Sequence, residues 1–255
     1  KTSINPLNFC FSLLRVIQVL KHVKPDVLHL ITLKPIIWGG LASKIFMPKV
    51  VIASVTGLGQ IYTDKRLSSF LIKKFIEIMY KISYSNKENK FFIFQNFHDR
   101  NYIQRLLKIN NDKITMTNGA GVYLNEYVCK PFPKGEPVFL FASRLLKAKG
   151  VLDFIEAANF VTNAKFLIAG KFDPLNRDSI DKRILDKSLR DGKVQYLGYI
   201  KDICSLINQS SVVVLPSYYG EGLPKILIEA SACGRPIITT NLPGCKDAII
   251  DGKSG

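Results

Sequence analysis

Long apolar runs, acidic residues and cysteines are all scarce in this sequence, and each shortage excludes a class of protein. No apolar stretch approaches the roughly 18 uninterrupted residues that a membrane-spanning helix needs, and the chain shows no secretory signal peptide. The 5 cysteines are scattered, odd in number and without metal-type spacing. They therefore fit buried thiols in a reducing cytoplasm rather than a disulfide scaffold.

The shortage of acidic residues leaves a net charge of +16 that is unevenly distributed. Residues 1–134 contain 20 Lys and Arg against 7 Asp and Glu, a net charge of +13, whereas residues 135–255 contain 16 against 13, a net charge of +3. A basic surface favours nucleic acid, an anionic membrane or solubility alone. A nucleic-acid binder would account for the charge, but the sequence lacks the interleaved aromatic and basic residues typical of that class.

Apolar periodicity predicts strands and helices that alternate along the chain. We expect strands at 26–31, 50–55, 91–94, 113–116, 138–141, 166–170, 194–198, 212–215 and 236–240, and helices at 8–24, 38–46, 68–84, 96–107, 151–161, 182–190 and 224–233. This alternation predicts an α/β fold with doubly wound parallel sheets. The periodicity breaks in a segment with two prolines, so we expect a domain at 1–122, a linker at 123–136 and a domain at 137–255.

The stretch 215–244 carries the clearest chemical signal. A buried strand leads into a turn rich in Gly and Pro, and a helix opens near Pro224, a residue favoured at the first helical position. A further strand follows. The loop and helix N-terminus of such a strand–helix–strand unit suit a phosphate-bearing ligand.

Two carboxylates stand in this unit, Glu221 on the loop and Glu229 one turn beyond Lys225 on the helix. At about 1.5 Å per residue they lie at most about 12 Å apart along the helix axis. That is roughly the reach from a nucleotide's ribose, across a diphosphate, to a sugar. A plainer interpretation has Glu221 complement the helix dipole and Glu229 pair with Lys225 at the surface.

A second candidate ligand segment follows the strand expected at 138–141. Arg144 and Lys149 stand just before the helix expected at 151–161, where positive charge opposes the helix dipole. The two cations are easier to understand if an anion lies among them and shares main-chain N–H groups. Lys147 fits solvated surface charge better.

The sequences EGLPK, EASACGRP and NLPGC within 215–245 resemble the retaining GT-B glycosyltransferases of family 4, especially bacterial enzymes that build O-antigen, capsule and other lipid-linked glycans. The resemblance implies two facing Rossmann-like domains, the N-terminal one incomplete. It implies that Glu221 grips the donor's sugar and Glu229 its ribose. Relatives often have a basic residue just before the first glutamate, where this chain has Gly220. The donor-binding residues that it implies are Arg144, Lys149, Gly198, Tyr199, Gly220, Glu221, Gly222, Leu223, Pro224 and Glu229.

On the acceptor side, the resemblance draws attention to two segments at the carboxyl ends of expected strands, where open α/β sheets place ligands. The residues are Thr56, Gly57, Gly59 and His98. A tight turn explains Gly57 and Gly59 equally well, and capping or a surface contact explains His98.

The resemblance implies transfer of a sugar, with retention, from a nucleotide diphosphate donor, UDP-linked for preference, to a lipid-linked saccharide. Its catalytic residues would be Glu221, Arg144 and Lys149. We expect no cofactor and no metal because the sequence has no D-x-D pair. The implied location is cytoplasmic, peripheral on the inner face of a bacterial plasma membrane, with no nucleic-acid partner. An inactive scaffold of the same fold stays open, especially because the first residue is Lys1 and the chain ends within DGKSG, so we expect a longer protein.

The helix expected at 68–84 has two interpretations. Its sequence places Lys73, Glu77 and Lys81 on one face, Lys65 and Arg66 precede it, and Lys87 and Lys90 follow it. One interpretation is a core-packed helix with a solvated side. The other is a helix that lies on anionic lipid, where each basic residue contributes about 1 kcal/mol.

Overall fold

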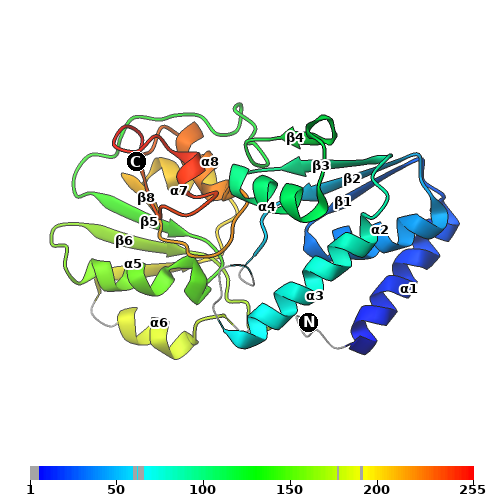
Figure 1. The fold of residues 1–255 in the computed structure, drawn as a ribbon. Helices are drawn as coiled ribbons and strands as arrows, with labels where there is room; N and C mark the ends of the chain where they lie inside the picture. The colour runs from blue at the N-terminus through cyan, green and yellow to red at the C-terminus, as the bar shows by residue number, and fades with distance from the viewer. Residues whose placement is uncertain (1–5, 60–61, 63–65, 177, 190–191) are drawn as a thin grey trace. The chain divides into compact units, whose positions relative to one another are not determined.

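The computed structural model describes residues 6–59, 62, 66–176, 178–189 and 192–255. They form two compact units, and each unit carries a parallel sheet covered by helices (Figure 1). The first unit comprises the described residues as far as Gly119 together with Gly220–Gly222, and the second comprises those of Ala120–Tyr219 and Leu223–Gly255. The α/β class predicted from the sequence is confirmed.

The first unit is built around a four-stranded parallel sheet in the order β1-β2-β3-β4. Its elements are α1 (Pro6–Val23), β1 (Val27–Ile31), α2 (Leu33–Phe46), β2 (Val50–Val55), α3 (Leu67–Ser83), β3 (Lys90–Phe94), α4 (Phe97–Leu107), a 3-10 turn (Asn111–Lys113) and β4 (Ile114–Met116). The register pairs Ala53 with Leu30 on one side and with Phe92 on the other. These inner side chains are buried because both faces of a parallel sheet are covered by helices.

Helix α2 begins at Leu33, five residues before the start predicted from the sequence, residue 38. The first turn was not predicted, because it contains Pro35 and a proline usually marks the boundary of a helix. At the third helical position its missing N–H costs no intrahelical hydrogen bond. Helix α2 lies between α1 and α3, and the three helices pack side by side (Figure 1).

Lys73 and Glu77 do lie on one face of α3, as predicted, and both contact Tyr102 of α4. Glu77 is buried, and its carboxylate accepts hydrogen bonds from the hydroxyl of Tyr102 on α4 and from Lys74 Nζ, the latter at 3.1 Å. Lys73 Nζ lies 4.9 Å from the centre of the Tyr102 ring. Packing of α3 against α4 therefore covers Glu77 and part of Lys73, whereas Lys81 is exposed.

The outer face of α3 is apolar with basic residues between. The exposed apolar side chains are Leu67, Phe70, Leu71, Phe75, Ile78 and Ile82. Lys74 and Lys81 are also exposed on this face. Lys65, which the sequence analysis counted with this helix, lies outside the described residues. The helix also packs against the core through Ile76 and Tyr80, so the choice between its two interpretations stays a prediction.

The second unit is built around a five-stranded parallel sheet in the order β7-β6-β5-β8-β9. Its elements are β5 (Val138–Ala142), a 3-10 turn (Lys147–Lys149), α5 (Val151–Ala158), β6 (Lys165–Ala169), α6 (Lys182–Leu189), β7 (Val194–Gly198), α7 (Ile203–Asn208), β8 (Val212–Leu215), α8 (Lys225–Ala232), β9 (Ile237–Thr239) and a 3-10 turn (Lys246–Ala248). The chain steps outward from β5 to β7 and then returns to the other side of β5 at β8. Helices α5 and α6 accordingly cover one face of the sheet, and α7 and α8 the other (Figure 1).

Two local features of this unit differ from the prediction. Helix α5 ends at Ala158 rather than at about residue 161, whereas α8 begins at Lys225 with Pro224 as its extended N-cap, close to the predicted start. Helix α7 was not predicted, because its six residues are too few to show a helical period. Its N-cap, Asp202, accepts a hydrogen bond from Ser205 N at 3.0 Å.

Candidate functional site

The order of the second sheet reverses between β5 and β8, and this reversal determines where a ligand fits. Open α/β sheets bind ligands outside the carboxyl ends of the strands at such a point. The segments that follow these two strands, 143–150 and 216–219, are tied together at that edge. Tyr218 N and Ser217 Oγ donate hydrogen bonds to Ala148 O at 2.8 and 3.3 Å. Gly150 has φ 77°, and a Cβ there would lie 2.1 Å from Pro216 O.

Arg144 and Lys149, predicted as a phosphate clamp, both lie on the segment after β5. Arg144 Nη1 forms an ion pair with Asp173 Oδ2 at 3.1 Å, and half of its side chain is exposed. Lys149 Nζ lies 5.3 Å from the centre of the Tyr219 ring, on the segment after β8. Both cations thus lie at the carboxyl edge of the sheet, Arg144 toward the segment after β6 and Lys149 toward the segment after β8. Their binding of a diphosphate stays a prediction.

A tyrosine and a carboxylate stand beside this clamp. The hydroxyl of Tyr218 donates to Asp153 Oδ2 on α5. Burial, together with the Asp153 carboxylate, raises the pKa of Tyr218 to about 12. The phenol therefore stays protonated at neutral pH and can act only as a neutral group.

Gly198 and Tyr199, predicted to border the base, lie at the carboxyl end of β7. Gly198 has φ 69°, and its carbonyl accepts a hydrogen bond from Gly170 N at 2.7 Å. Tyr199 is exposed, and Lys171 Nζ lies 3.8 Å from the centre of its ring. Lys171 was missed in the sequence analysis; its position two residues after β6 was the available signal.

Glu229 lies in the middle of α8 and is almost completely buried. Its side chain is 8% exposed, whereas that of Lys225, its partner in a 3.4 Å ion pair, is 62% exposed. Glu229 Oε1 also accepts a hydrogen bond from Tyr127 Oη at 2.7 Å. The Lys225–Glu229 pair of the plainer interpretation is therefore present, but its carboxylate is buried and not at the surface. Tyr127 was missed as a site residue, because nothing local to residue 127 signals a contact 102 residues away.

Glu221 lies between two glycines that pack closely within the first unit. Gly59 N donates to Gly220 O at 3.0 Å, and Asn96 Nδ2 donates to Glu221 O at 3.1 Å. A Cβ on Gly222 would lie 2.5 Å from the carbonyl oxygen of Thr56. Glycine is thus required here by close main-chain approach.

The expected acceptor-side residues lie around the same tripeptide. Thr56 directly follows β2, and Gly57, with φ 123°, would place a Cβ 2.7 Å from Gly222 N. His98 lies in the first turn of α4 with its side chain 60% exposed, and its Nδ1 is 3.3 Å from Asp99 Oδ1. Asp99 is buried, and burial raises the pKa of its carboxyl. These contacts explain the conformations of Gly57 and His98 without a ligand, so their acceptor role stays a prediction.

Leu223 and Pro224 belong to the second unit and lead into α8. Leu223 is half-buried and Pro224 is buried, with its carbonyl accepting from Leu227 N at 3.1 Å. The donor-side residues are consequently divided. Gly220–Gly222 fall in the first unit, and the remaining donor-side residues fall in the second.

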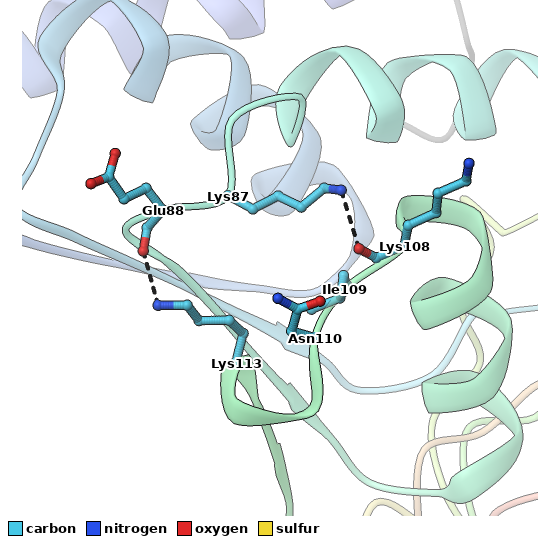
Figure 2. A pocket seen from close by; sticks show the side chains of 6 residues that line it. All are labelled: Lys87, Glu88, Lys108, Ile109, Asn110 and Lys113. Carbon is cyan, nitrogen blue, oxygen red and sulfur yellow. Dashed lines mark hydrogen bonds between the residues drawn. The ribbon is translucent and has the colours of Figure 1, made fainter.

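A basic pocket in the first unit lies away from this edge. Its lining residues are Lys87, Glu88, Lys108, Ile109, Asn110 and Lys113 (Figure 2). It lies where β3 and β4 begin, at the amino edge of the sheet. Two of its ammonium groups bind main-chain carbonyls, Lys87 Nζ to Lys108 O at 3.2 Å and Lys113 Nζ to Glu88 O at 3.0 Å (Figure 2). Lys87 and Lys113 therefore stabilise the main chain around the pocket, and the pocket is not part of the candidate site.

Within residues 6–59, 62, 66–176, 178–189 and 192–255, no three His, Cys, Asp or Glu side chains are grouped so that they could hold a metal ion. No helix in the same part of the chain has the length and apolar character needed to cross a bilayer.

Comparison with known proteins decides the family. Residues 129–255 match the family described as glycosyl transferases group 1, and residues 1–96 match the family described as glycosyl transferase 4-like. The chain belongs to the GT-B glycosyltransferases of family 4. The resemblance noted in the sequence is thereby confirmed.

Named relatives of this glycosyltransferase build bacterial glycans. It is 29% identical, over its whole length and 69% of the relative's, to the N,N'-diacetylbacillosaminyl-diphospho-undecaprenol alpha-1,3-N-acetylgalactosaminyltransferase of Campylobacter jejuni. It is 27% identical, over 96% of the chain and 66% of the relative, to the capsular polysaccharide biosynthesis glycosyltransferase CapM of Staphylococcus aureus. It is 28% identical, over 91% of the chain and 62% of the relative, to the UDP-Gal:alpha-D-GlcNAc-diphosphoundecaprenol alpha-1,3-galactosyltransferase of Escherichia coli. The chain thus spans about two thirds of these relatives.

Solved structures share the fold. The Anabaena protein Alr3699/HepE in complex with UDP-glucose has a TM-score of 0.70 at 18% identity, covering 91% of this chain and 64% of that one. The lipopolysaccharide outer core galactosyltransferase WaaB, in its apo form, has a TM-score of 0.60 at 18% identity, covering 92% and 62%. At such identities the likeness extends to the fold alone.

Proposed function

We propose that this protein is a retaining, metal-independent glycosyltransferase that moves a sugar from a nucleoside diphosphate, UDP in preference, to a saccharide carried on a lipid diphosphate. The observation that carries the proposal is the placement of Arg144 and Lys149 on the segment after β5, at the carboxyl edge of the second sheet, with the buried carboxylate of Glu229 on the helix that follows β8. That set matches the parts of a nucleoside diphosphate: cations for phosphate and a carboxylate for ribose hydroxyls.

The chemistry places negative charge on the departing diphosphate. The bond from the anomeric carbon to the diphosphate oxygen breaks, a bond to the acceptor oxygen forms on the same face, and the acceptor's proton passes to the leaving phosphate. Arg144 and Lys149 would stabilise the charge that develops, because fixed cations act most strongly where charge appears only in the transition state. Glu221 would hold the transferred sugar.

The choice of donor and acceptor is supported by the relatives. One relative is named as a UDP-galactose enzyme, and two are named for diphospho-undecaprenol acceptors. A structural neighbour holds UDP-glucose. We extend these chemistries to this chain as part of the proposal, together with action at the inner face of a bacterial membrane.

The outer face of α3 supports contact with an anionic membrane. Its exposed apolar side chains alternate with Lys74 and Lys81, and this half of the sequence has a net charge of +13, from 20 basic and 7 acidic residues. A helix with this composition lies in the plane of a lipid surface, with its apolar side chains at the acyl boundary and its lysines near anionic headgroups.

The test is calorimetric titration of UDP and of GDP into the chain, beside the Arg144→Ala/Lys149→Ala variant. We expect saturable binding of one nucleotide that the variant loses. The control is Lys165→Ala/Lys193→Ala, which removes the same charge at the amino edge of the same sheet. Equal loss in both variants would mean a non-specific charge effect, and no binding by folded wild-type chain would favour an inactive scaffold. Nucleotide binding that EDTA abolishes would contradict metal independence.

A further inference from the structure

Tyr127 lies in the segment between the two sheets, after β4 and before β5, and it contacts the candidate site through Glu229. Its hydroxyl donates to Glu229 Oε1 at 2.7 Å, and Lys225 Nζ lies 3.4 Å from the same oxygen. Among the described residues, no hydrogen bond or ion pair reaches Glu229 Oε2. The carboxylate therefore has one oxygen engaged by two donors and a second oxygen with its lone pairs available.

The main chain on both sides of Tyr127 is held against α7 and the turn after α8. Cys204 Sγ donates to Glu126 O at 3.2 Å, and Asn208 Nδ2 donates to Val128 O at 3.0 Å. Arg235 Nη2 donates to Lys130 O at 2.9 Å. Asn208 and Arg235 are both buried. The position of the phenol is thus determined by the fold of the second unit.

The phenol is suited to hold a carboxylate in one orientation. Burial, and then the hydrogen bond to Glu229, raise the pKa of Tyr127, so its hydroxyl remains a donor throughout the physiological range. A fixed donor at Oε1 restricts rotation of the carboxylate about its last bond and sets the direction of Oε2. Groups that bind a ligand need this kind of support to keep their geometry.

We propose that Tyr127 is a positioning residue for nucleotide recognition: by engaging Oε1 of Glu229 it directs Oε2 toward the ribose hydroxyls of the donor. The proposal rests on the function proposed above, in which Glu229 takes the ribose. It adds to that function a residue from outside both sheets.

The test compares UDP with 2′-deoxy- and 3′-deoxy-UDP, by calorimetric titration into wild type, Tyr127→Phe and Glu229→Gln. If the titration above selects guanine, the same comparison uses GDP and its deoxy analogues. We expect wild type to prefer the full ribose by about 10-fold or more over at least one analogue, since a hydrogen bond to a charged group contributes about 1.5–3 kcal/mol. In Tyr127→Phe that preference should fall below about 3-fold, mainly through weaker UDP binding, because the carboxylate loses its fixed direction.

The control is Tyr196→Phe, which removes a hydroxyl that bonds Gly170 O at 2.9 Å in the same unit. It should leave the preference unchanged. Tyr127→Phe keeps the ring and the main-chain contacts, and a thermal melt checks that it folds. If Tyr127→Phe weakens UDP and the deoxy analogues equally, its role is only structural and the proposal is overturned.

Failure of the inference and failure of the proposed function give different results. A preference lost in Glu229→Gln but retained in Tyr127→Phe overturns the role of Tyr127 and leaves the ribose role of Glu229 intact. A preference retained in both variants overturns both roles. Absence of nucleotide binding by the wild type overturns the donor site itself and the inference with it.

Discussion

The two halves of the chain share one architecture but use their charged side chains differently. The second half has a net charge of +3, from 16 basic and 13 acidic residues, and places Arg144, Lys149 and Glu229 at or near the switch point of its sheet. The first half has a net charge of +13, from 20 basic and 7 acidic residues, and carries exposed lysines on an apolar helix. Under the proposed function, the second half would serve a small ligand and the first half a charged surface, and the difference lies in where the charges stand on similar folds.

The largest expected effect is a loss of stability when the close packing of Gly150 against Pro216, in the second half, is disturbed. Gly150→Ala should lower the free energy of unfolding by at least about 3 kcal/mol, because a left-handed alanine is strained and its Cβ would meet Pro216 O. Urea unfolding followed by circular dichroism measures this loss. The control is Gly192→Ala, whose φ of 69° is similar but whose Cβ would meet nothing within 4 Å. It should lose only about 1–2 kcal/mol, the conformational part. Equal losses would mean that the close approach to Pro216 is not required.

The next effect tests the charged surface of the first half. Lys74→Gln/Lys81→Gln should weaken binding to anionic vesicles by about 30-fold at low salt, since each basic residue near such a surface contributes about 1 kcal/mol. Sedimentation with phosphatidylserine and with phosphatidylcholine vesicles measures it. Lys187→Gln/Lys193→Gln, in the second unit, should change little. If wild type shows no preference for anionic vesicles, the division of labour between the halves is wrong.

The strands were predictable from sequence, whereas the contacts of the site were not. The inner strands of parallel sheets are buried on both faces, so runs such as Val212–Leu215 and Val50–Val55 give a continuous apolar signal. Arg144 and Lys149 were predicted as ligand residues because they stand between such a run and the N-terminus of the next helix. Tyr127 and Glu229 meet only through the tertiary fold, and no local pattern records their contact.

The burial of Glu77 shows the same limit in the first half. Helical spacing correctly places Glu77 on α3 but does not say which face meets a neighbouring helix. Tyr102, 25 residues later, supplies the hydrogen bond that makes burial of the carboxylate possible. Local sequence patterns therefore predict helices, strands and loops. The hydrogen-bond partners of buried polar groups can be identified only from the structure.

The smallest effect concerns Lys90, a buried cation of the first half that lies at the amino edge of its sheet, away from any ligand edge. Its Nζ donates to Ser83 O at 2.6 Å, and burial together with the charge of Lys44 lowers its pKa from 10.5 to about 8. Between these two values the unfolded chain holds a proton that the folded chain has lost. The contribution of Lys90 to stability is therefore least favourable below pH 8 and improves as the pH rises from about 8 to about 10.5.

Lys90→Met removes this dependence, so the free energy of unfolding of wild type minus that of the variant should rise by about 1 kcal/mol between about pH 8 and pH 9. Urea unfolding at both pH values measures the difference, and the exposed Lys81→Met serves as the control with no such rise. A difference that stays flat would mean that Lys90 keeps an ordinary pKa in the folded chain. A rise confined to Lys90 would show that the first half, despite its excess of positive charge, tolerates one cation in its interior only at a measurable cost. Its remaining basicity would then be available for a surface partner, as the comparison of the two halves requires.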